Sequence, residues 1–392
     1  ILIVISRHID RVRTFIRSSK YFTEKMANLE LLVVNPHSCV TIGDAMREIY
    51  RDPRSHLRGE FIVISGFAVC KPGIRALVDR HIQRRIDDDR VILTALFNRY
   101  SATCPIKDTK RDVFIVAERK SNEILYINSH DQTSYLLKKG PIFNKPHMDV
   151  MFDLNYSGIY FFDNRALQLF TDNFDFQTVD DLINNVLGDD IIQKAICYDI
   201  VNDEYIGPMS SLNMYYMVSF DVLERWSHPF TPDKKGYTQH FDQVYFNENV
   251  EVDRSADLRG GIALGRNTFI GQNVVLDHTI IGDNCYIGSN TTITNSYIWS
   301  NVKIENDCTI ENAIICDDAV ILHHTELIKG CILSFGVRVG PRAVIPQLTI
   351  VHIPQSNYEA IGPCPIVDLG LESNGTIYTI YESEIDNYKW GY

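Results

Sequence analysis

The first 230 residues alternate short apolar runs with segments whose apolar residues recur at helical spacing. The apolar runs predict strands at 1–5, Leu31–Val34, Phe61–Ser65 and Val91–Phe97. The helical spacing predicts helices at Ile9–Ile16, Ile42–Tyr50 and Ile74–Ile86. Alternation of this kind is typical of βαβ units, so we predict buried strands in a mostly parallel sheet that is covered on both faces.

The α/β pattern continues beyond residue 100. Residues 101–112 are predicted to form a loop, and the β runs Val113–Ala117 and Ile124–Ile127 are joined by a polar turn. Thr178 is followed three residues later by Asp181, which predicts a capped start for a helix at Val179–Leu187. The region 1–232 is therefore predicted to be an α/β domain.

A different period begins at Leu264. Apolar residues recur in steps of six, six and five, so corresponding positions repeat every 17 residues. These positions are Leu264, Ile270, Leu276, Ile281, Ile287, Ile293, Ile298, Ile304, Ile310, Ile315, Ile321, Leu327 and Ile332. Each step fits one short strand plus a turn, and three steps make one triangular coil that must stack on its neighbours to bury its interior. The period predicts a left-handed β-helix of hexapeptide repeats.

Glycines follow the inward aliphatic residue at 265, 271, 282 and 288, where a side chain would crowd the turn. We place the β-helix at 258–352, after a connector at 233–257. An acidic, aromatic tail at 353–392 completes the predicted domain order.

Composition narrows the classes of protein. At 392 residues the chain is long enough for two domains of about 100–200 residues each. The 38 Lys and Arg against 50 Asp and Glu give a net charge of −12, which argues against a generally nucleic-acid-binding surface. No apolar run approaches the roughly 20 residues that span a bilayer. Nine cysteines without a CxxC pair indicate reduced thiols and a cytosolic protein. Because the chain opens on a strand-like run without Met, we expect the natural N-terminus to lie further upstream.

An α/β domain followed by a hexapeptide β-helix is the architecture of sugar-nucleotide pyrophosphorylases, which cradle a triphosphate in a Gly-rich loop and hold Mg²⁺ on carboxylates. The Gly-rich loop would precede residue 1. The metal-binding Asp of those enzymes follows a Gly at the end of a buried strand, where this chain has Gly66-Phe67. Phenylalanine cannot bind a hard cation, so neither this catalysis nor a metal cofactor is expected.

Hexapeptide coils also occur in acyltransferases, which use a histidine at the coil edge as general base. The candidates are His278, His323 and His324, and the alternative is that all three are exposed turn residues. Cysteines 285, 308, 316 and 331 lie among the coils without ligand spacing and are predicted to be buried as small hydrophobic residues.

Several strings resemble one family. They are LFTDNFDFQT at 169–178, SLNMY at 211–215, RW at 225–226 and PFTP at 229–232, together with the 17-residue coils. These strings are similar to the epsilon subunit of eukaryotic translation initiation factor 2B, the guanine-nucleotide exchange factor for initiation factor 2. The resemblance runs from about residue 1 to 350 and is densest at 151–232.

The resemblance implies a non-enzymatic pyrophosphorylase-like domain and a β-helix that assemble with a gamma subunit and other exchange-factor subunits. The Asn-Phe motif of the family falls on Asn173 and Phe174, which implies contact with the client, initiation factor 2. Asp172 and Asp175 flank the pair and suit a basic partner surface. The alternative is that Phe174 packs beneath the following helix while Asn173 shapes the turn.

The family carries its exchange activity in a C-terminal helical domain, whereas only about 38 residues follow Pro354 here. The chain is therefore expected to be a fragment or a divergent form. A pyrophosphorylase homologue that senses sugar nucleotides remains a further alternative.

A possible assembly surface on the β-helix comprises Val275, Tyr286, Tyr297 and Trp299, together with Val274, because aromatic residues are favoured at interface cores.

Overall fold

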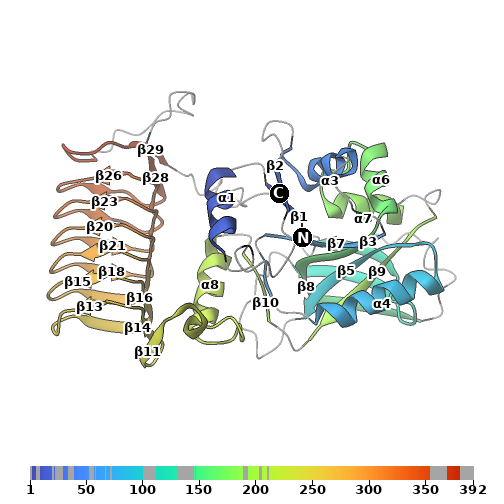
Figure 1. The fold of residues 1–392 in the computed structure, drawn as a ribbon, viewed down its shortest axis with the longest axis horizontal. Helices are drawn as coiled ribbons and strands as arrows, with labels where there is room; N and C mark the ends of the chain where they lie inside the picture. The colour runs from blue at the N-terminus through green and yellow to red at the C-terminus, as the bar shows by residue number, and fades with distance from the viewer. Residues whose placement is uncertain are drawn as a thin grey trace. The chain divides into compact units, whose positions relative to one another are not determined.

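The computed structural model of the chain (Figure 1) contains two compact units that divide between Met214 and Tyr215. The N-terminal unit is a mixed α/β domain, and the C-terminal unit is a left-handed parallel β-helix, as predicted. The structure describes residues 2–5, 9–19, 22, 30–33, 39–52, 57, 59–66, 68–70, 73–99, 112–129, 145, 147–188, 193–202, 205–209, 212–353 and 369–379.

The main sheet of the N-terminal unit has the strand order β7-β6-β8-β5-β9, with β3 beside β8. Its strands are β3 (Glu60–Ile64), β5 (Val91–Arg99), β6 (Asp112–Glu118), β7 (Ile124–Ser129), β8 (Met148–Asp163) and β9 (Ala195–Val201). Within this sheet β5 and β9 run parallel, whereas the other pairs are antiparallel. The prediction of a mostly parallel sheet is therefore wrong. The physical reason is β8, which has no counterpart among the predicted strands and runs back between β6 and β5.

Two short strand pairs accompany this sheet. β1 (Leu2–Ile5) pairs in parallel with β2 (Glu30–Val33), and β4 (Ala68–Cys70) pairs antiparallel with β10 (Ile206–Pro208). The prediction of buried strands fails for β1, which is half-buried, and for β3. On β3, Ile62 and Ile64 are 36% and 49% exposed. That strand lies at the edge of the sheet, where a side chain has neighbours on one side.

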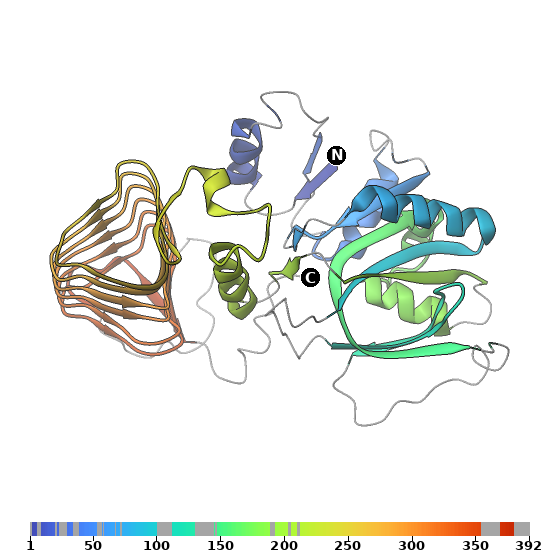
Figure 2. The same ribbon diagram turned by 90° about the horizontal axis from the view of Figure 1, so that it is seen from below.

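Helices cover both faces of the sheet, which confirms that part of the prediction (Figure 2). They are α3 (Ile42–Arg51), α4 (Ile74–Asp87), α6 (Arg165–Asp172) and α7 (Val179–Gly188). A further helix of the unit, α1 (Ile9–Ser18), contributes no residue to the core beneath these helices. Helix α4 packs Leu77 against one face, and α3, α6 and α7 pack against the other. The predicted cap of α7 is confirmed, because Thr178 N donates to Asp181 Oδ2 at 2.8 Å and Asp181 N donates to Thr178 Oγ1 at 3.1 Å.

The β-helix stacks short parallel strands on three faces. One face holds β13 (Glu251–Val252), β15 (Phe269–Ile270), β17 (Tyr286–Ile287), β20 (Lys303–Ile304), β23 (Val320–Ile321) and β26 (Arg338–Val339). The other two share a sheet that bends at β14 (Asp257–Leu264) and β16 (Val275–Ile281). The second face continues with β18 (Thr292–Thr294), β21 (Thr309–Glu311), β24 (Glu326–Leu327) and β27 (Val344–Ile345). The third contains β12 (Val244–Phe246), β19 (Tyr297–Ile298), β22 (Ile314–Ile315), β25 (Ile332–Leu333) and β28 (Thr349–His352).

The predicted inward residues from Leu264 to Leu327 are all buried in one core. Ile332 is the exception, because Leu333 takes the inward position and pairs with Ile315. One extra residue lengthens the repeat from 17 to 18 at this point. The earliest coil strand, β12, lies within the stretch predicted to be a connector.

Side-chain ladders line two corners of the β-helix. At each rung a residue with positive φ donates its amide Nδ2 hydrogen to Oδ1 of the next coil at 2.9–3.1 Å. Asn tolerates the left-handed conformation better than most residues because its short side chain can form hydrogen bonds locally. The ladders are Asn249–Asn267–Asn284–Asn301–Asp318 and Asn273–Asn290–Asp307. Both therefore end on a carboxylate.

We predict that Asn284→Ala lowers the free energy of unfolding by about 2 kcal/mol, because alanine loses two ladder hydrogen bonds and is strained at a φ of 58°. Asn284→Gly removes the same bonds without the strain and should cost about 1 kcal/mol. Urea unfolding of both variants measures the difference. Equal losses would mean that the backbone conformation contributes nothing.

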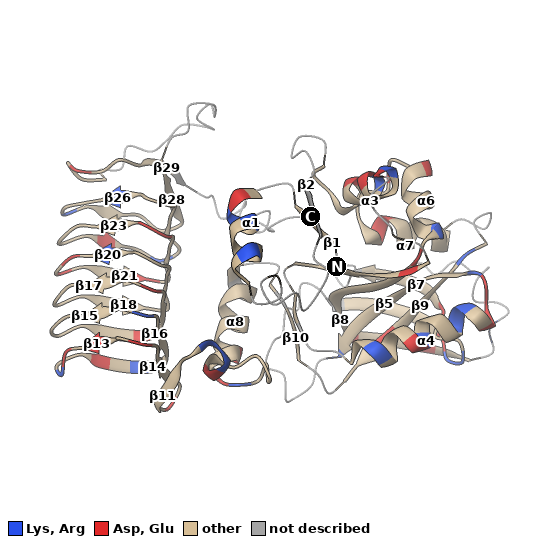
Figure 3. Ribbon diagram, in the orientation of Figure 1, with Lys and Arg blue, Asp and Glu red and all other residues tan. Residues whose placement is uncertain are grey.

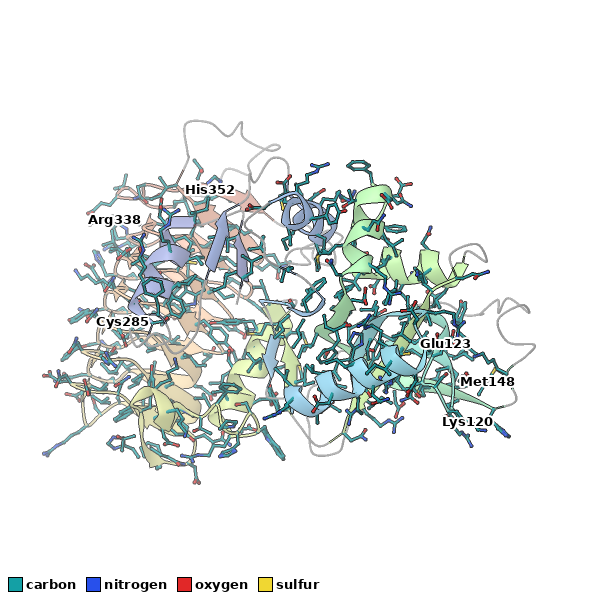
Figure 4. All side chains as sticks on the ribbon, turned by 45° about the vertical axis from the view of Figure 1, so that its right-hand side comes forward. Lys120, Glu123, Met148, Cys285, Arg338 and His352 are labelled. Carbon is teal, nitrogen blue, oxygen red and sulfur yellow. The ribbon has the colours of Figure 1, made fainter. Side chains whose placement is uncertain are left out.

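Residues 369–379 return to the end of the β-helix. Leu369 O accepts from Gly340 N at 2.8 Å, and Asn374 Oδ1 accepts from Arg338 N at 2.6 Å. Strand β29 (Thr376–Thr379) pairs antiparallel with β28. Arg338 and His352, labelled in Figure 4, belong to this end of the coil. This part of the predicted tail therefore covers the last coil, while the acidic residues at 359, 368, 382, 384 and 386 lie outside the described residues.

None of the described helices combines the length and apolarity that a membrane crossing requires. Within the described ranges, no cluster of three or more His, Cys, Asp or Glu side chains is placed to hold a metal ion.

Candidate partner-binding site

The loop between α6 and α7 is held by the start of α3. A capping box fixes that start: Thr41 Oγ1 accepts from Asp44 N at 3.2 Å, and Asp44 Oδ2 accepts from Thr41 N at 3.1 Å. Gly43 N donates to Gln177 O at 2.9 Å. A Cβ at Gly43 would lie 2.0 Å from Phe176 O, so only glycine allows α3 to approach the loop this closely.

Within the loop, the two predicted residues, Asn173 and Phe174, lie in different environments. Asn173 Oδ1 accepts from Asp175 N at 3.0 Å, so this side chain shapes the turn. Phe174 is 62% exposed, whereas Phe176 is buried against Phe170. The alternative in which Phe174 packs beneath the following helix is therefore wrong, and Phe176 occupies that position. The flanking Asp172 and Asp175 are exposed.

A buried arginine of α3 completes the site. Arg47 is 3% exposed and donates from Nη1 to Phe170 O at 3.1 Å and to Phe176 O at 3.3 Å. Its Nη2 donates to Asp44 Oδ1 at 2.8 Å, and its guanidinium carbon lies 5.2 Å from the centroid of the Phe174 ring. Burial alone would raise the pKa of Asp44. Hydrogen bonds from Arg47 and from the amides of Val40 and Thr41 outweigh that effect and lower the pKa to about 2.

These contacts suit recognition more than bond-making chemistry. An exposed aromatic ring stands on a loop that is tied to a capped helix through one buried guanidinium. Figure 3 shows acidic and basic positions close together on α3, where Arg47 and Asp44 pair internally. The exposed carboxylates of Asp172 and Asp175 give the loop a negative edge.

The predicted assembly surface on the β-helix is only partly open. Tyr297 is 4% exposed because α8 (Leu212–Leu223) covers it, with the ring of Tyr215 4.8 Å away. Trp299 is half-buried at the margin of the same cluster, and Val275 is also half-buried. Tyr286 is exposed and stacks on Phe269 with 5.2 Å between ring centroids. The expectation for Val274 is wrong, because its side chain faces the coil interior.

Of the three candidate histidines, His323 and His324 lie in a turn of the coil, whereas His278 lies within β16, where the sheet bends. His278 and His324 have positive φ angles of 45° and 57°. His278 Nδ1 lies 2.6 Å from Asp277 Oδ1, and His323 Nδ1 lies 3.2 Å from Glu305 Oε2. His324 Nδ1 lies 3.8 Å from Asp307 Oδ2. Each ring is thus about half exposed beside a carboxylate. The turn interpretation is confirmed for His323 and His324 and is wrong for His278, which belongs to a strand.

Comparison with known proteins points to one family. A family model described as the EIF2B subunit epsilon LbH domain matches residues 241–345. Translation initiation factor eIF2B subunit epsilon of Schizosaccharomyces pombe is 29% identical over 271 residues, which are 67% of this chain and 40% of that protein. The protein of the same name from Dictyostelium discoideum is 26% identical over 252 residues, 62% of this chain and 35% of its own length.

Over about two thirds of its length, the chain is similar to eIF2B subunit epsilon. This agrees with the resemblance carried by the strings at 151–232 and by the coils. The chain spans about two fifths of the length of the first relative and about a third of the second. The matched family domain begins within β11 (Thr238–Phe241) and ends at β27 of the β-helix. Phe67, on which the loss of pyrophosphorylase chemistry was predicted, lies outside the described residues.

Three cysteines of the chain act as hydrogen-bond donors inside the β-helix. Cys285, Cys308 and Cys331 are buried, as predicted, and each is 23 residues from the next, which is one 17-residue coil plus one six-residue step. The nearest acceptor of Cys331 is Ile328 O at 2.7 Å, whereas Cys285 and Cys308 each donate to a carbonyl 14 residues ahead, at 2.9 and 3.3 Å. Thr291 does the same with its hydroxyl. The thiols therefore occupy positions that hydroxyl side chains fill in other coils.

We predict that these three thiols resist alkylation in the folded protein. Burial raises the pKa of each to about 11, so at pH 8 the reactive thiolate should be roughly a hundredfold scarcer than in a peptide. Iodoacetamide labelling followed by peptide mass spectrometry measures each rate. Denaturant should remove the protection, and labelling at the peptide rate without denaturant would contradict this prediction.

Sequence reasoning missed Arg47, the residue that ties α3 to the loop. It is 126 residues from Asn173, so no local pattern connects the two. The available signal was Thr41 with Asp44 three residues later, which marks a capped helix start but does not say what that helix contacts.

Proposed function

We propose that this chain is a scaffold and client-binding subunit of the guanine-nucleotide exchange factor for initiation factor 2. The observation that carries the proposal is Phe174, an exposed ring held in place on the loop after α6. Support for the family comes from the two relatives named eIF2B subunit epsilon. The negative edge of the loop at Asp172 and Asp175 suits a basic surface on the client.

The proposed role needs no covalent step in this chain. An exchange factor that binds the nucleotide-free client more tightly than the GDP-bound client shifts the equilibrium toward release of GDP. The loop would contribute part of the binding energy, and the catalytic step would belong to a helical domain outside this chain. We accordingly propose a non-enzymatic chain without a cofactor.

The proposed partners are the gamma subunit, the remaining exchange-factor subunits and initiation factor 2, in the cytosol. Tagged chain expressed in eukaryotic cells should co-purify with the gamma subunit. Recovery of the chain alone as a homotrimer would contradict the scaffold role and would favour the acyltransferase alternative.

We predict that Asn173→Ala combined with Phe174→Ala weakens binding to initiation factor 2 at least tenfold, which corresponds to about 1.4 kcal/mol. The alanines remove the exposed ring and the acceptor that shapes the turn. Binding of the purified factor to the complex that contains this chain, followed by GDP-release kinetics, measures the effect.

Phe15→Ala serves as the matched control, because Phe15 is another exposed phenylalanine of the same unit. It should leave binding unchanged. An unchanged melting temperature would show that the double variant folds, and normal exchange by that variant would remove the loop from the proposed site.

A further inference from the structure

Arg47 is the one buried arginine among the described residues, and its three hydrogen-bond acceptors belong to the site. Two of the three are backbone carbonyls, at the end of α6 and in the following loop. The third is the Asp44 carboxylate of its own helix. A planar guanidinium can make these contacts together because its donors point in fixed, divergent directions.

The two carbonyls bracket the exposed ring. Phe170 precedes Phe174 by four residues, and Phe176 follows it by two, so one side chain fixes both ends of this short stretch. The guanidinium also lies 5.2 Å from the ring centroid, a distance at which cation–π attraction operates. Arg47 therefore restrains both the backbone of the loop and the ring itself.

We infer that Arg47 is a positioning residue that holds Phe174 in its binding-competent orientation. Because the Arg47 side chain is only 3% exposed, a partner has almost no direct contact with it. Any effect of Arg47 on binding must therefore act through the loop. This inference rests on the proposed function only for its effect on binding. The restraint of the loop is a property of the chain alone.

The same geometry indicates the chemistry of the contact. The Arg47 guanidinium contacts one part of the Phe174 ring, and the rest of the ring is exposed to a partner. The open part is flanked in sequence by the exposed carboxylates of Asp172 and Asp175. An aromatic face beside carboxylates favours a lysine or arginine side chain of the partner.

The test compares Arg47→Lys with Arg51→Lys. Lysine keeps the positive charge, but its single nitrogen cannot replace both Nη1, which donates to the two carbonyls, and Nη2, which pairs with Asp44. Arg51 is on the same helix, is exposed and lies 3.7 Å from Glu48, so its replacement tests the substitution itself.

The first readout is hydrogen exchange in the full chain. In Arg47→Lys, the amides of Asp175, Phe176 and Gln177 should exchange about tenfold faster, while amides of α4 stay unchanged. Arg51→Lys should change neither group. Unchanged loop amides, or an equal acceleration in α4, would overturn the inference, because the first shows no restraint and the second shows only a general loss of stability.

The second readout is a double-mutant cycle with purified initiation factor 2. Arg47→Lys alone should weaken binding about tenfold, and in the Phe174→Ala background it should weaken binding less than twofold. Equal losses in both backgrounds would overturn the inference, because Arg47 would then act independently of the ring. If Phe174→Ala itself leaves binding unchanged, the proposed site fails, and hydrogen exchange alone decides whether Arg47 positions the loop.

Discussion

Gly265→Ala is expected to destabilise the β-helix by about 3 kcal/mol or more, and to lower its melting temperature by roughly 10 °C. A Cβ at this position would lie 2.4 Å from the carbonyl carbon of Gly282 and 2.6 Å from Asp283 N. Both atoms are backbone of the next coil. Hydrogen bonds from Gly265 N to Ile281 O at 2.8 Å and from Gly282 N to Ile298 O at 2.7 Å prevent the coils from separating without loss.

A graded series checks this explanation. At Gly271 a Cβ would lie 3.0 Å from the nearest backbone atoms, so Gly271→Ala should cost less than Gly265→Ala. At Gly66 no atom lies within 4 Å, and Gly66→Ala should be neutral or slightly stabilising. Thermal unfolding followed by circular dichroism ranks the three variants. A ranking that does not follow these distances would contradict the crowding explanation.

Asp199→Ala should lower the free energy of unfolding of the N-terminal unit by about 3 kcal/mol. Asp199 on β9 is 5% exposed and accepts from Arg84 Nη1 and Nη2 at 2.9 and 2.8 Å, which ties α4 to the sheet. Removing the carboxylate leaves the Arg84 guanidinium, only 17% exposed, without this compensation. Urea unfolding monitored in the N-terminal unit measures the loss.

The matched control is Asp88→Ala. Asp88 lies 2.6 Å from Arg90, closer than the Asp199 pair, but the two side chains are 35% and 51% exposed. Solvent screens such a pair, so this variant should lose less than about 1 kcal/mol. Similar losses for the two variants would mean that burial does not decide the strength of these ion pairs.

The β-helix could be predicted nearly residue by residue because its sequence signal repeats. Each inward position in one coil is checked by the same position in the next, and the glycines mark the sites where coils approach most closely. The prediction is wrong at Ile332, because one additional residue in the turn places Leu333 in the inward position instead. A fixed period cannot anticipate a single insertion.

The α/β unit was harder to predict because strand direction is not encoded locally. The apolar runs at β3 and β5 are consistent with parallel or antiparallel neighbours. Strand β8 makes these neighbours antiparallel, but its sequence does not show the pattern of a strand. Asp149, Asp153 and Asn155 interrupt the apolar residues, and Gly158 has a φ of 74°. A register shift between β6 and β8 disturbs the alternation further.

Long-range contacts also explain why only part of the candidate site could be predicted. Asn173 and Phe174 were found through the family resemblance, and the acceptor role of Asn173 in the turn was a reasonable local expectation. The exposure of Phe174 depends on Phe176 taking the buried position and on contacts from α3. Contacts between segments more than a hundred residues apart produce no periodic pattern in the sequence.

The corner ladders of the β-helix also have a direction. The carboxylate of Asp318 can only accept a hydrogen bond, so the amide of Asn301 must donate to it and must turn its oxygen toward Asn284. Because each amide has one donating and one accepting end, the orientation of Asn301 fixes that of Asn284, and so on along the ladder to Asn249. A single aspartate therefore selects one of two otherwise equivalent amide orientations along the whole corner, and Asp307 does the same for the second ladder.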